Sequence, residues 1–528
     1  MKKRKSTSYL IVSSCDMGID KDIIKVYAQV AKYYKAKVIH LGPTATRQEF
    51  NQFHRLSTAV AVAEAQLDNA QTDAQYETAH HRLAFLEREQ KNVQSAEDGR
   101  VETLLRHFKK LTCVTTPEIS LPKLFNKKRK GLSVKSEGIE LSKFLFLSPI
   151  PPSSPRATRV TMPSVALNYL KDSGKNWIVA HPVPSIDVIP KPGLNQAHNF
   201  FTVGCLLSPT QPCKTQDQYK YGHMPCAILV TIDAANGEFH PKQMHIDYIK
   251  RGTNATQQPV VLDDGLVFST TSVREVKSDD KGTASFDNHA PFTHPGVLGC
   301  LRGLNILHQP AHLIDGGDAS DFHSVCRHNE GLPGEGEGLR LVDDLKTVRR
   351  LLDAEANVPS IKYKTLLDSN HHNWLTRFVM KNPALIGLLD WKTLSEGMFS
   401  DWRLILLEGG ENEIFYFGDF PLRHGDKEGA LRSAERIFKK GKYLRGHLHK
   451  LVAFRRAVQV GAGSSLGLKY TENEINSWQN HIVSLTKFLG IAAVNPKIVL
   501  HDKKRKVSRI AYRNHVYEMD QYELVEKI

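Results

Sequence analysis

The chain has 528 residues, more than one hydrophobic core usually serves, so we expect at least two domains. Lys and Arg number 71 against 56 Asp and Glu, and the resulting net charge of +15 favours a polyanionic partner such as DNA. The seven cysteines show no C-x-x-C spacing, which argues against a thiolate metal site or a disulfide framework, and no apolar run is long enough for a membrane span. We therefore expect a cytoplasmic protein without membrane contact.

The chain opens with a predicted strand at residues 9–12, a helix at 23–34 and a second strand at 37–41. Residues 55–110 are rich in Ala, Gln and Glu and predict one or two long helices, such as an antiparallel hairpin. A solvated insertion is the plainest interpretation of these helices. A dimerisation arm or a DNA-guiding arm is the alternative.

A polar segment at 251–261 predicts a linker between an N-terminal domain, 1–250, and a C-terminal domain, 262–528. Residues 174–208 and 441–465 resemble each other, which suggests a duplicated domain. Two runs of Lys and Arg, 127–130 and 503–506, are candidate DNA contacts, although such runs are usually solvated turns.

Five short polar motifs follow one another in the C-terminal half, most of them directly after an apolar run. They are Asp287-Asn-His289, Gly317-Asp318 with Asp321, Asn370-His371, Arg423-His424-Gly-Asp426 and Gly446-His447-Leu-His449. The carboxyl ends of strands in an α/β sheet are where such proteins build their sites. Two divalent cations about 3.5–4 Å apart repel each other, so a carboxylate must bridge them while neutral imidazoles fill other positions. One such motif is common at surfaces, but five in this order predict a dinuclear metal site.

This pattern of D-x-H, GD-x-x-D, N-H, H and G-H-x-H resembles the calcineurin-like metallophosphoesterases, including nucleases of double-strand-break repair. The resemblance implies an α/β fold of the α+β sandwich type, with a catalytic C-terminal domain and a degenerate N-terminal copy that carries a helical insertion at about 50–110. Residues 287–292 and 321–325 are similar to phage-encoded members. We therefore expect a phage early protein that degrades host DNA in the host cytoplasm, with DNA, further copies of itself and a second phage early protein as partners.

The resemblance also implies roles for single residues. The first cation would be held by Asp287, His289 and His449, and Asp318 would bridge to a second cation held by Asn370, His424 and His447. Such nitrogen and oxygen donors suit Mn²⁺, with Fe²⁺ and Zn²⁺ as alternatives.

In the implied reaction, activated water attacks phosphorus in line and His371 protonates the departing oxygen, while Asp321 steadies a ligand. One departure concerns the usual Gly-Asn-His-Asp/Glu, which here reads Ser369-Asn370-His371-His372 and puts the geometry of that loop in question.

The N-terminal half lacks these motifs. It has Asp16-Met-Gly18 in place of D-x-H, Gly42-Pro43 in place of Gly-Asp, and His181-Pro-Val183 in place of His-x-His. Paired cations without a bridging carboxylate would be electrostatically unsupported, so we predict no dinuclear site in residues 1–250.

Three functions compete: a deoxyribonuclease, a phosphatase or phosphodiesterase for small molecules or phosphoproteins, and a non-catalytic DNA-binding or host-inhibiting protein. The net charge favours the first. Trp374 and Phe378 are four residues apart and suited to stacking on unpaired bases, but a stripe facing the core is the more ordinary interpretation.

Overall fold

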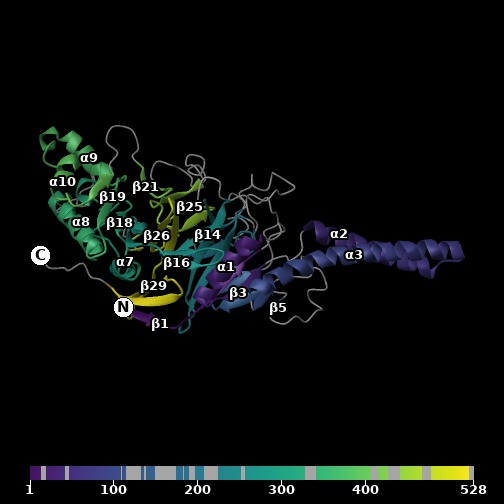
Figure 1. The fold of residues 1–528 in the computed structure, drawn as a ribbon. Coiled ribbons are helices and arrows are strands. Elements are labelled where there is room, and N and C mark those ends of the chain that lie inside the picture. The colour runs from purple at the N-terminus through teal and green to yellow at the C-terminus, as the bar shows by residue number, and fades with distance from the viewer. Residues whose placement is uncertain are drawn as a thin grey trace.

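The computed structural model describes most of the chain. The described residues are 1–13, 20–41, 47–108, 110–114, 132–135, 138–148, 174–181, 183–189, 197–206, 224–250, 256–326, 340–405, 414–425, 441–466 and 477–521. They form a mixed α/β structure of five sheets, with helices on the outer faces (Figure 1).

The described strands divide into two successive series. The first series is β1 (Lys2–Arg4), β2 (Ser6–Val12), β3 (Lys37–Leu41), β4 (Leu111–Val114), β5 (Leu132–Lys135), β6 (Ile139–Ser142), β7 (Leu145–Ser148), β8 (Asn176–Val179), β9 (Ser185–Ile189), β10 (His198–Thr202), β11 (Cys226–Asp233), β12 (Phe239–His245), β13 (Asp247–Ile249), β14 (Gln258–Asp263) and β15 (Leu266–Phe268). The second series is β16 (Val273–Glu275), β17 (Lys281–Ser285), β18 (His312–Asp315), β19 (Tyr363–Leu367), β20 (Arg403–Ile405), β21 (Phe415–Phe417), β22 (Phe420–Leu422), β23 (Tyr443–Arg445), β24 (Val452–Phe454), β25 (Ala457–Gln459), β26 (His481–Phe488), β27 (Ile491–Ile498), β28 (Leu500–Asp502), β29 (Val507–Tyr512) and β30 (His515–Asp520).

The second series repeats the first strand for strand. One six-stranded sheet has the order β5-β4-β3-β2-β11-β12 and the other β20-β19-β18-β17-β26-β27, with the same pattern of parallel and antiparallel pairs. The ten-stranded sheet contains β6-β7-β8-β10-β9 and its counterpart β21-β22-β23-β25-β24. This agreement supports the predicted duplication, and we call the two series the first and second units.

The two units are joined by strand pairing. β9 and β24, which are equivalent strands, pair antiparallel at the centre of the ten-stranded sheet. The opening strand of each unit also joins the closing hairpin of the other, because β1 pairs with β30 and β16 with β15. The boundary of the repeat therefore falls between Phe268 and Val273. Within the predicted linker, residues 251–255 lie outside the described part, and 258–261 belong to β14.

The main core lies where both six-stranded sheets pack on the ten-stranded sheet. Helices cover the outer faces: α1 (Lys21–Tyr34) over the first unit, and α7 (Pro295–His308), α8 (Leu341–Ala356), α9 (His372–Lys381) and α10 (Trp391–Glu396) over the second. The predicted strand–helix–strand at the N-terminus is confirmed as β2-α1-β3. Asp20 caps α1 by accepting hydrogen bonds from two backbone N–H groups of its first turn.

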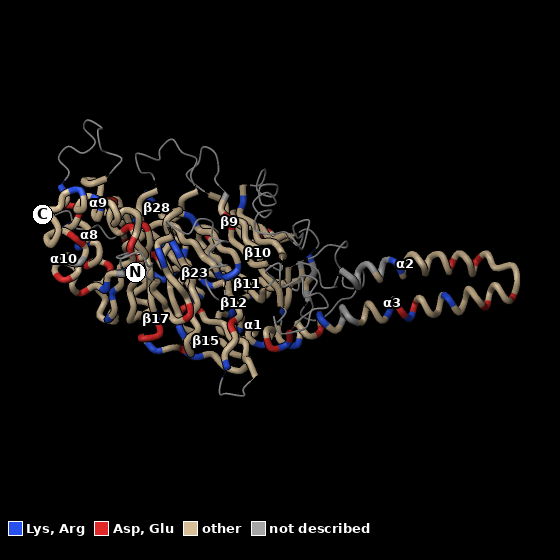
Figure 2. The backbone as a smooth tube through the Cα atoms, turned by 90° about the horizontal axis from the view of Figure 1, so that it is seen from above, with Lys and Arg blue, Asp and Glu red and all other residues tan. Residues whose placement is uncertain are grey.

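An antiparallel helical hairpin projects from the first unit (Figures 1 and 2). It consists of α2 (Arg47–Asp68) and α3 (Asp73–His107), which confirms the prediction of long helices in this region. The hairpin carries seven Lys and Arg against ten Asp and Glu, so its charge is opposite to that of the whole chain. A negatively charged arm is poorly suited to DNA phosphates, and this disfavours the DNA-guiding alternative.

Other sequence predictions concern the two basic runs, several motif residues and the cysteines. Residues 503–506 form an exposed turn between β28 and β29, which is the plain interpretation of that basic run. The basic run at 127–130 lies outside the described residues, as do Asp426, Asp16 to Gly18, and Gly42 with Pro43. The cysteines within the described part of the chain are buried free thiols.

Candidate metal centre

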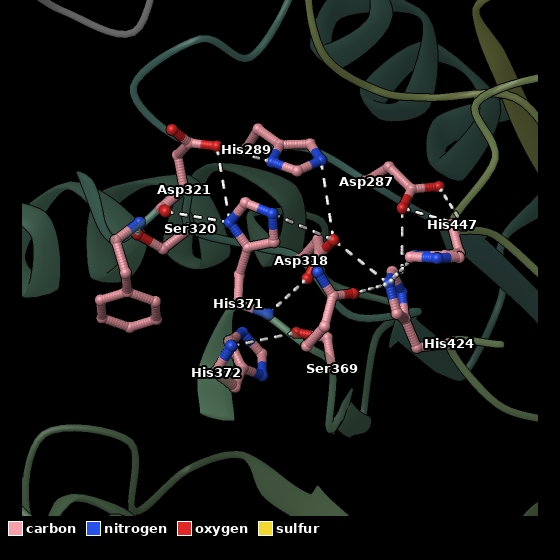
Figure 3. Close-up of polar contacts among 12 residues, drawn as sticks. Asp287, His289, Asp318, Ser320, Asp321, Ser369, His371, His372, His424 and His447 are labelled. Atoms are coloured by element: carbon pink, nitrogen blue, oxygen red, sulfur yellow. Dashed lines mark hydrogen bonds and ion pairs between the residues drawn. The ribbon is translucent and has the colours of Figure 1, made fainter. Parts of the chain in front are cut away.

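The motif residues gather where strands of two different sheets end. Asp287 and His289 follow β17, Asp318 follows β18, and Asn370 follows β19. These three strands are parallel neighbours in one six-stranded sheet. The remaining ligand candidates, His424, His447 and His449, follow β22 and β23 of the facing ten-stranded sheet. The structure brings all seven predicted ligands together. Figure 3 labels five of them, Asp287, His289, Asp318, His424 and His447.

The first donor group contains Asp287, His289 and His449. The two imidazole Nε2 atoms lie 3.2 Å apart, and His449 Nε2 lies 3.7 Å from Asp287 Oδ1. All three side chains are almost fully buried. Two imidazole nitrogens this close must share a proton or a cation, because two lone pairs would repel each other.

The second donor group surrounds His424. Its Nε2 lies 3.1 Å from Asp318 Oδ2, 2.9 Å from Asn370 Oδ1 and 3.3 Å from His447 Nδ1. The ring faces these donors because its other nitrogen, Nδ1, donates to the Gly316 carbonyl oxygen at 3.3 Å. Four N and O donors thus converge on one small volume.

Asp318 belongs to both groups. Its Oδ2 atom is 3.1 Å from His424 Nε2 on one side and 3.7 Å from His289 Nε2 on the other. Burial tends to raise the pKa of Asp318, but His371 and His424 hold it well below its usual value. A carboxylate that stays ionised between two sets of imidazoles fits a pair of divalent cations, for which these residues supply oxygen and nitrogen donors without thiolate.

Five of the seven ligand candidates have a left-handed backbone, which non-glycine residues rarely adopt. They are Asp287, His289, Asp318, His447 and His449, with φ of 53°, 48°, 52°, 73° and 53°. Backbone hydrogen bonds between the loops impose this conformation. The N–H of Asp287 donates to Gly317 O at 3.1 Å, and that of His289 donates to Asp318 O at 2.8 Å. Strained residues of this kind cluster at functional sites.

Close approach also explains Gly446. A Cβ atom there would lie 2.5 Å from Asp287 Oδ2, and the same carboxylate accepts hydrogen bonds from the His447 N–H at 2.9 and 3.0 Å. Asp287 is completely buried, and burial is the main reason that its pKa rises to about 6, while His424 lowers it and Asp318 raises it.

His371 and Asp321 lie beside the first donor group. His371 Nδ1 donates to the backbone oxygen of Asp321 at 2.9 Å, so Nε2 faces the donors, 3.9 Å from Asp318 Oδ2. Asp321 Oδ1 accepts from His289 Nδ1 at 3.0 Å, which directs the opposite nitrogen of that ring into the centre. This carboxylate–histidine pair is the arrangement that commonly orients a metal-binding imidazole. The pKa of His371 is lowered, mainly by burial.

His372, the departure from the family pattern, does not face the centre. It is fully buried beside Phe322 and Trp391, and its carbonyl oxygen accepts from Trp391 Nε1 at 3.2 Å. Burial lowers its pKa to about 3, so it is a neutral core residue. Trp374 lies against His371 with its ring tilted and the ring centroids 4.0 Å apart, and it packs on the adjoining core as the core-facing interpretation predicts. Phe378 is half-buried.

Several residues around the centre escaped the sequence analysis. Trp478 packs edge-on against His449 at 4.3 Å, and His323 donates to Asp321 Oδ2 at 3.2 Å. Asn288, Asp315 and Glu355 form a buried cluster beneath the loops. Glu355 had a signal, because it lies on the apolar stripe of α8, where a charged residue is unexpected.

The first unit differs at the equivalent place. Within the described ranges, every group of His and carboxylate side chains with metal-compatible spacing lies between residues 287 and 449. His181 follows β8, the equivalent of β23, and its Nδ1 accepts from the Val183 N–H at 3.1 Å. The prediction that residues 1–250 hold no dinuclear site stays a prediction.

Comparison with known proteins gives no assignment: no family model, no curated protein and no solved structure matches this chain. None of the helices in the described ranges is both long and apolar enough to cross a bilayer. The observations that bear on function are therefore the geometry of the centre and the charge of the chain.

Proposed function

We propose that the chain is a deoxyribonuclease of the calcineurin-like type, which hydrolyses DNA phosphodiester bonds with two divalent cations, best suited by Mn²⁺. The observation that carries the proposal is the position of Asp318 Oδ2 between two donor groups, within 3.1 Å of His424 Nε2 and 3.7 Å of His289 Nε2. When bound, the cations would lower the pKa of water and neutralise charge on the phosphoryl group.

The chain's own residues would do the rest. His371 is held by the Asp321 carbonyl so that Nε2 faces the donors, and this atom would pass a proton to the departing oxygen. Asp321 would keep His289 in place through the 3.0 Å contact between its Oδ1 and Nδ1. A centre that only stabilised the fold would have no use for an imidazole beside it that is 13% exposed and is not one of the predicted ligands.

The charge of the molecule supports DNA as the substrate. Lys and Arg exceed Asp and Glu by fifteen in the whole chain, and the acidic hairpin makes the excess larger for the rest. Basic side chains bind DNA by releasing condensed counterions, so affinity should fall steeply with salt. The proposal includes the expected setting: a phage early protein that degrades host DNA in the host cytoplasm.

The test is incubation of the purified chain with plasmid DNA in EDTA, Mg²⁺ or Mn²⁺. We expect cleavage with Mn²⁺, none in EDTA, and loss of cleavage in Asp318→Ala. Asp353→Ala is the matched control, because Asp353 is an exposed carboxylate on α8 that pairs with Arg349. Turnover of a chromogenic phosphodiester with intact DNA would favour a phosphatase or phosphodiesterase. Retention of DNA on a gel without any turnover would favour a non-catalytic DNA-binding or host-inhibiting protein.

A further inference from the structure

A second group of buried polar side chains lies directly beneath the candidate metal centre. It consists of Asn288, Asp315 and Glu355, whose exposed fractions are 2%, 0% and 1%. They come from three separate places: the loop after β17, the end of β18 and the last turn of α8. None of the three belongs to the predicted ligand set.

The amide of Asn288 connects the group. Its Nδ2 atom donates to Asp315 Oδ2 at 2.9 Å and to Glu355 Oε1 at 3.1 Å. Ser285 Oγ donates to the same Glu355 oxygen at 2.8 Å, and Asp315 Oδ1 accepts from the Gly317 N–H at 3.0 Å. The carboxyl of Glu355 is thus the acceptor that fixes the Asn288 side chain from the helix side.

This connection joins the two loops that carry the centre. Asn288 lies between Asp287 and His289, and Gly317 precedes Asp318. The oxygen of the same amide, Asn288 Oδ1, lies against Gly463. A Cβ atom on Gly463 would be only 1.9 Å from this oxygen, so no larger residue fits there. The Asn288 amide therefore fixes the position of the loop 287–289 relative to the loop that contains Asp318.

The described part of the first unit has other residues at two of the equivalent positions. The last paired residues of its equivalent parallel ladder are Val12 and His40, where the second unit has Ser285 and Asp315. The fold of a unit therefore does not require a serine and an aspartate at these two positions. Their presence in the unit that carries the metal-binding side chains points to a role in that centre.

No described Lys, Arg or His balances the two carboxyl groups. Burial raises the pKa of Glu355 well above its usual value, and the neighbouring Asp315 raises it further. The raised pKa favours the neutral form of Glu355, and a neutral amide of the same shape keeps the acceptor oxygen that Asn288 uses.

We propose that Glu355 is a positioning residue: from α8 it holds Asn288 through its carboxyl oxygen, and so keeps Asp287, His289 and Asp318 in the arrangement that binds two cations. The inference rests on the metal centre of the proposed function. It predicts that the acceptor oxygen at position 355 matters and its ionisation does not.

The experiment compares Glu355→Gln and Glu355→Leu in the full chain, by calorimetric titration of the metal-free protein with Mn²⁺ and by thermal unfolding in EDTA. Residues that orient metal ligands typically change metal affinity about 10- to 100-fold when replaced. We expect a loss of that size for Glu355→Leu, and affinity close to that of the unaltered chain for Glu355→Gln, which keeps the acceptor.

Equal Mn²⁺ affinity in all three proteins would overturn the inference, and so would an equal loss in Glu355→Gln. If Glu355→Leu does not fold, Asn288→Ala takes its place, because it removes the amide that Glu355 holds, and unchanged affinity of this variant would also count against the inference. The unaltered chain separates the two proposals. Binding of two Mn²⁺ without DNA cleavage would refute the nuclease and leave the role of Glu355 standing.

Discussion

The left-handed backbone at most of the ligand candidates is a property of single residues that the surrounding loops impose. A non-glycine residue in this conformation costs on the order of 1 kcal/mol or more of free energy. The conformation is therefore kept only where the surrounding structure holds it in place. Here the N–H groups of Asp287 and His289 donate hydrogen bonds to backbone oxygens of the loop that contains Asp318. These hydrogen bonds fix the two loops relative to each other. Hydrogen bonds within the protein therefore hold Asp287 and His289 in this conformation.

His371 offers the clearest separation of binding from catalysis. In His371→Gln we expect the DNA cleavage rate to fall about 10²- to 10⁴-fold, the range that a general acid contributes. Metal content should stay at two ions per chain, because the proposed ligand set does not include His371. Cleavage rates and elemental analysis of the same sample check this. Undiminished cleavage, or loss of metal, would contradict the role of His371.

Asp315 makes a prediction about pH. Burial raises its pKa to about 7, above the unfolded value near 4, so the folded protein binds more protons than the unfolded protein between these values. The stabilising contribution of neutral Asp315 is therefore complete below about pH 4 and is lost as pH rises to about 7. In EDTA, the free energy of unfolding of Asp315→Asn should fall less across this window than that of the unaltered chain. Urea titrations at several pH values measure the slopes, and parallel curves would contradict the assignment.

At the scale of secondary-structure elements, the sequence predicted what depends on local pattern. The strand–helix–strand at the N-terminus, the long helices of the hairpin and the polar motif after each apolar run all follow from periodicity and turn residues. Pairings between distant segments could not be predicted, because nothing local indicates that β1 joins β30 or that β14 begins inside the expected linker. The same reason hid the partner of Glu355, because this residue reaches Asn288 across 67 residues of sequence.

The hairpin arm allows a test of α3 that leaves the centre untouched. Gly99 lies in the helix, and a Cβ atom there would meet nothing within 4 Å. Because glycine costs about 0.5–1 kcal/mol relative to alanine inside a helix, Gly99→Ala should stabilise α3 by about that amount. Amide hydrogen exchange along residues 73–107 measures it, with DNA cleavage unchanged. Faster exchange in the variant would show that this segment is not helical in solution.

For the whole molecule, a buried group of charges joins the two units. Asp264 in the β14–β15 turn accepts hydrogen bonds from Lys242 of the first unit at 3.0 Å and from Lys497 of the second at 2.7 Å. Tyr34 and Asn495 reach the neighbouring Asp263 from either side. The units are thus connected by ion pairs as well as by strands.

Lys497→Met should destabilise the whole chain, because it leaves Asp264 with fewer compensating charges in a buried site. Removing one partner of a buried ion pair costs about 3–5 kcal/mol. Urea unfolding followed by fluorescence should show a single transition at a lower midpoint, since both units lose a shared contact. Two separate transitions would mean that the units unfold independently.

The junction of β9 and β24 has a consequence for the second unit on its own. If that unit were produced alone, β24 would become an open sheet edge, with the backbone groups of Ala453 and Phe454 unpaired. The nearest complementary edge in such a preparation is the same strand of another copy, and antiparallel pairing of two copies would recreate the ten-stranded sheet. The isolated unit would then be a symmetric dimer with two candidate metal centres, where the natural chain has one candidate centre and a first unit that carries none of its predicted ligands.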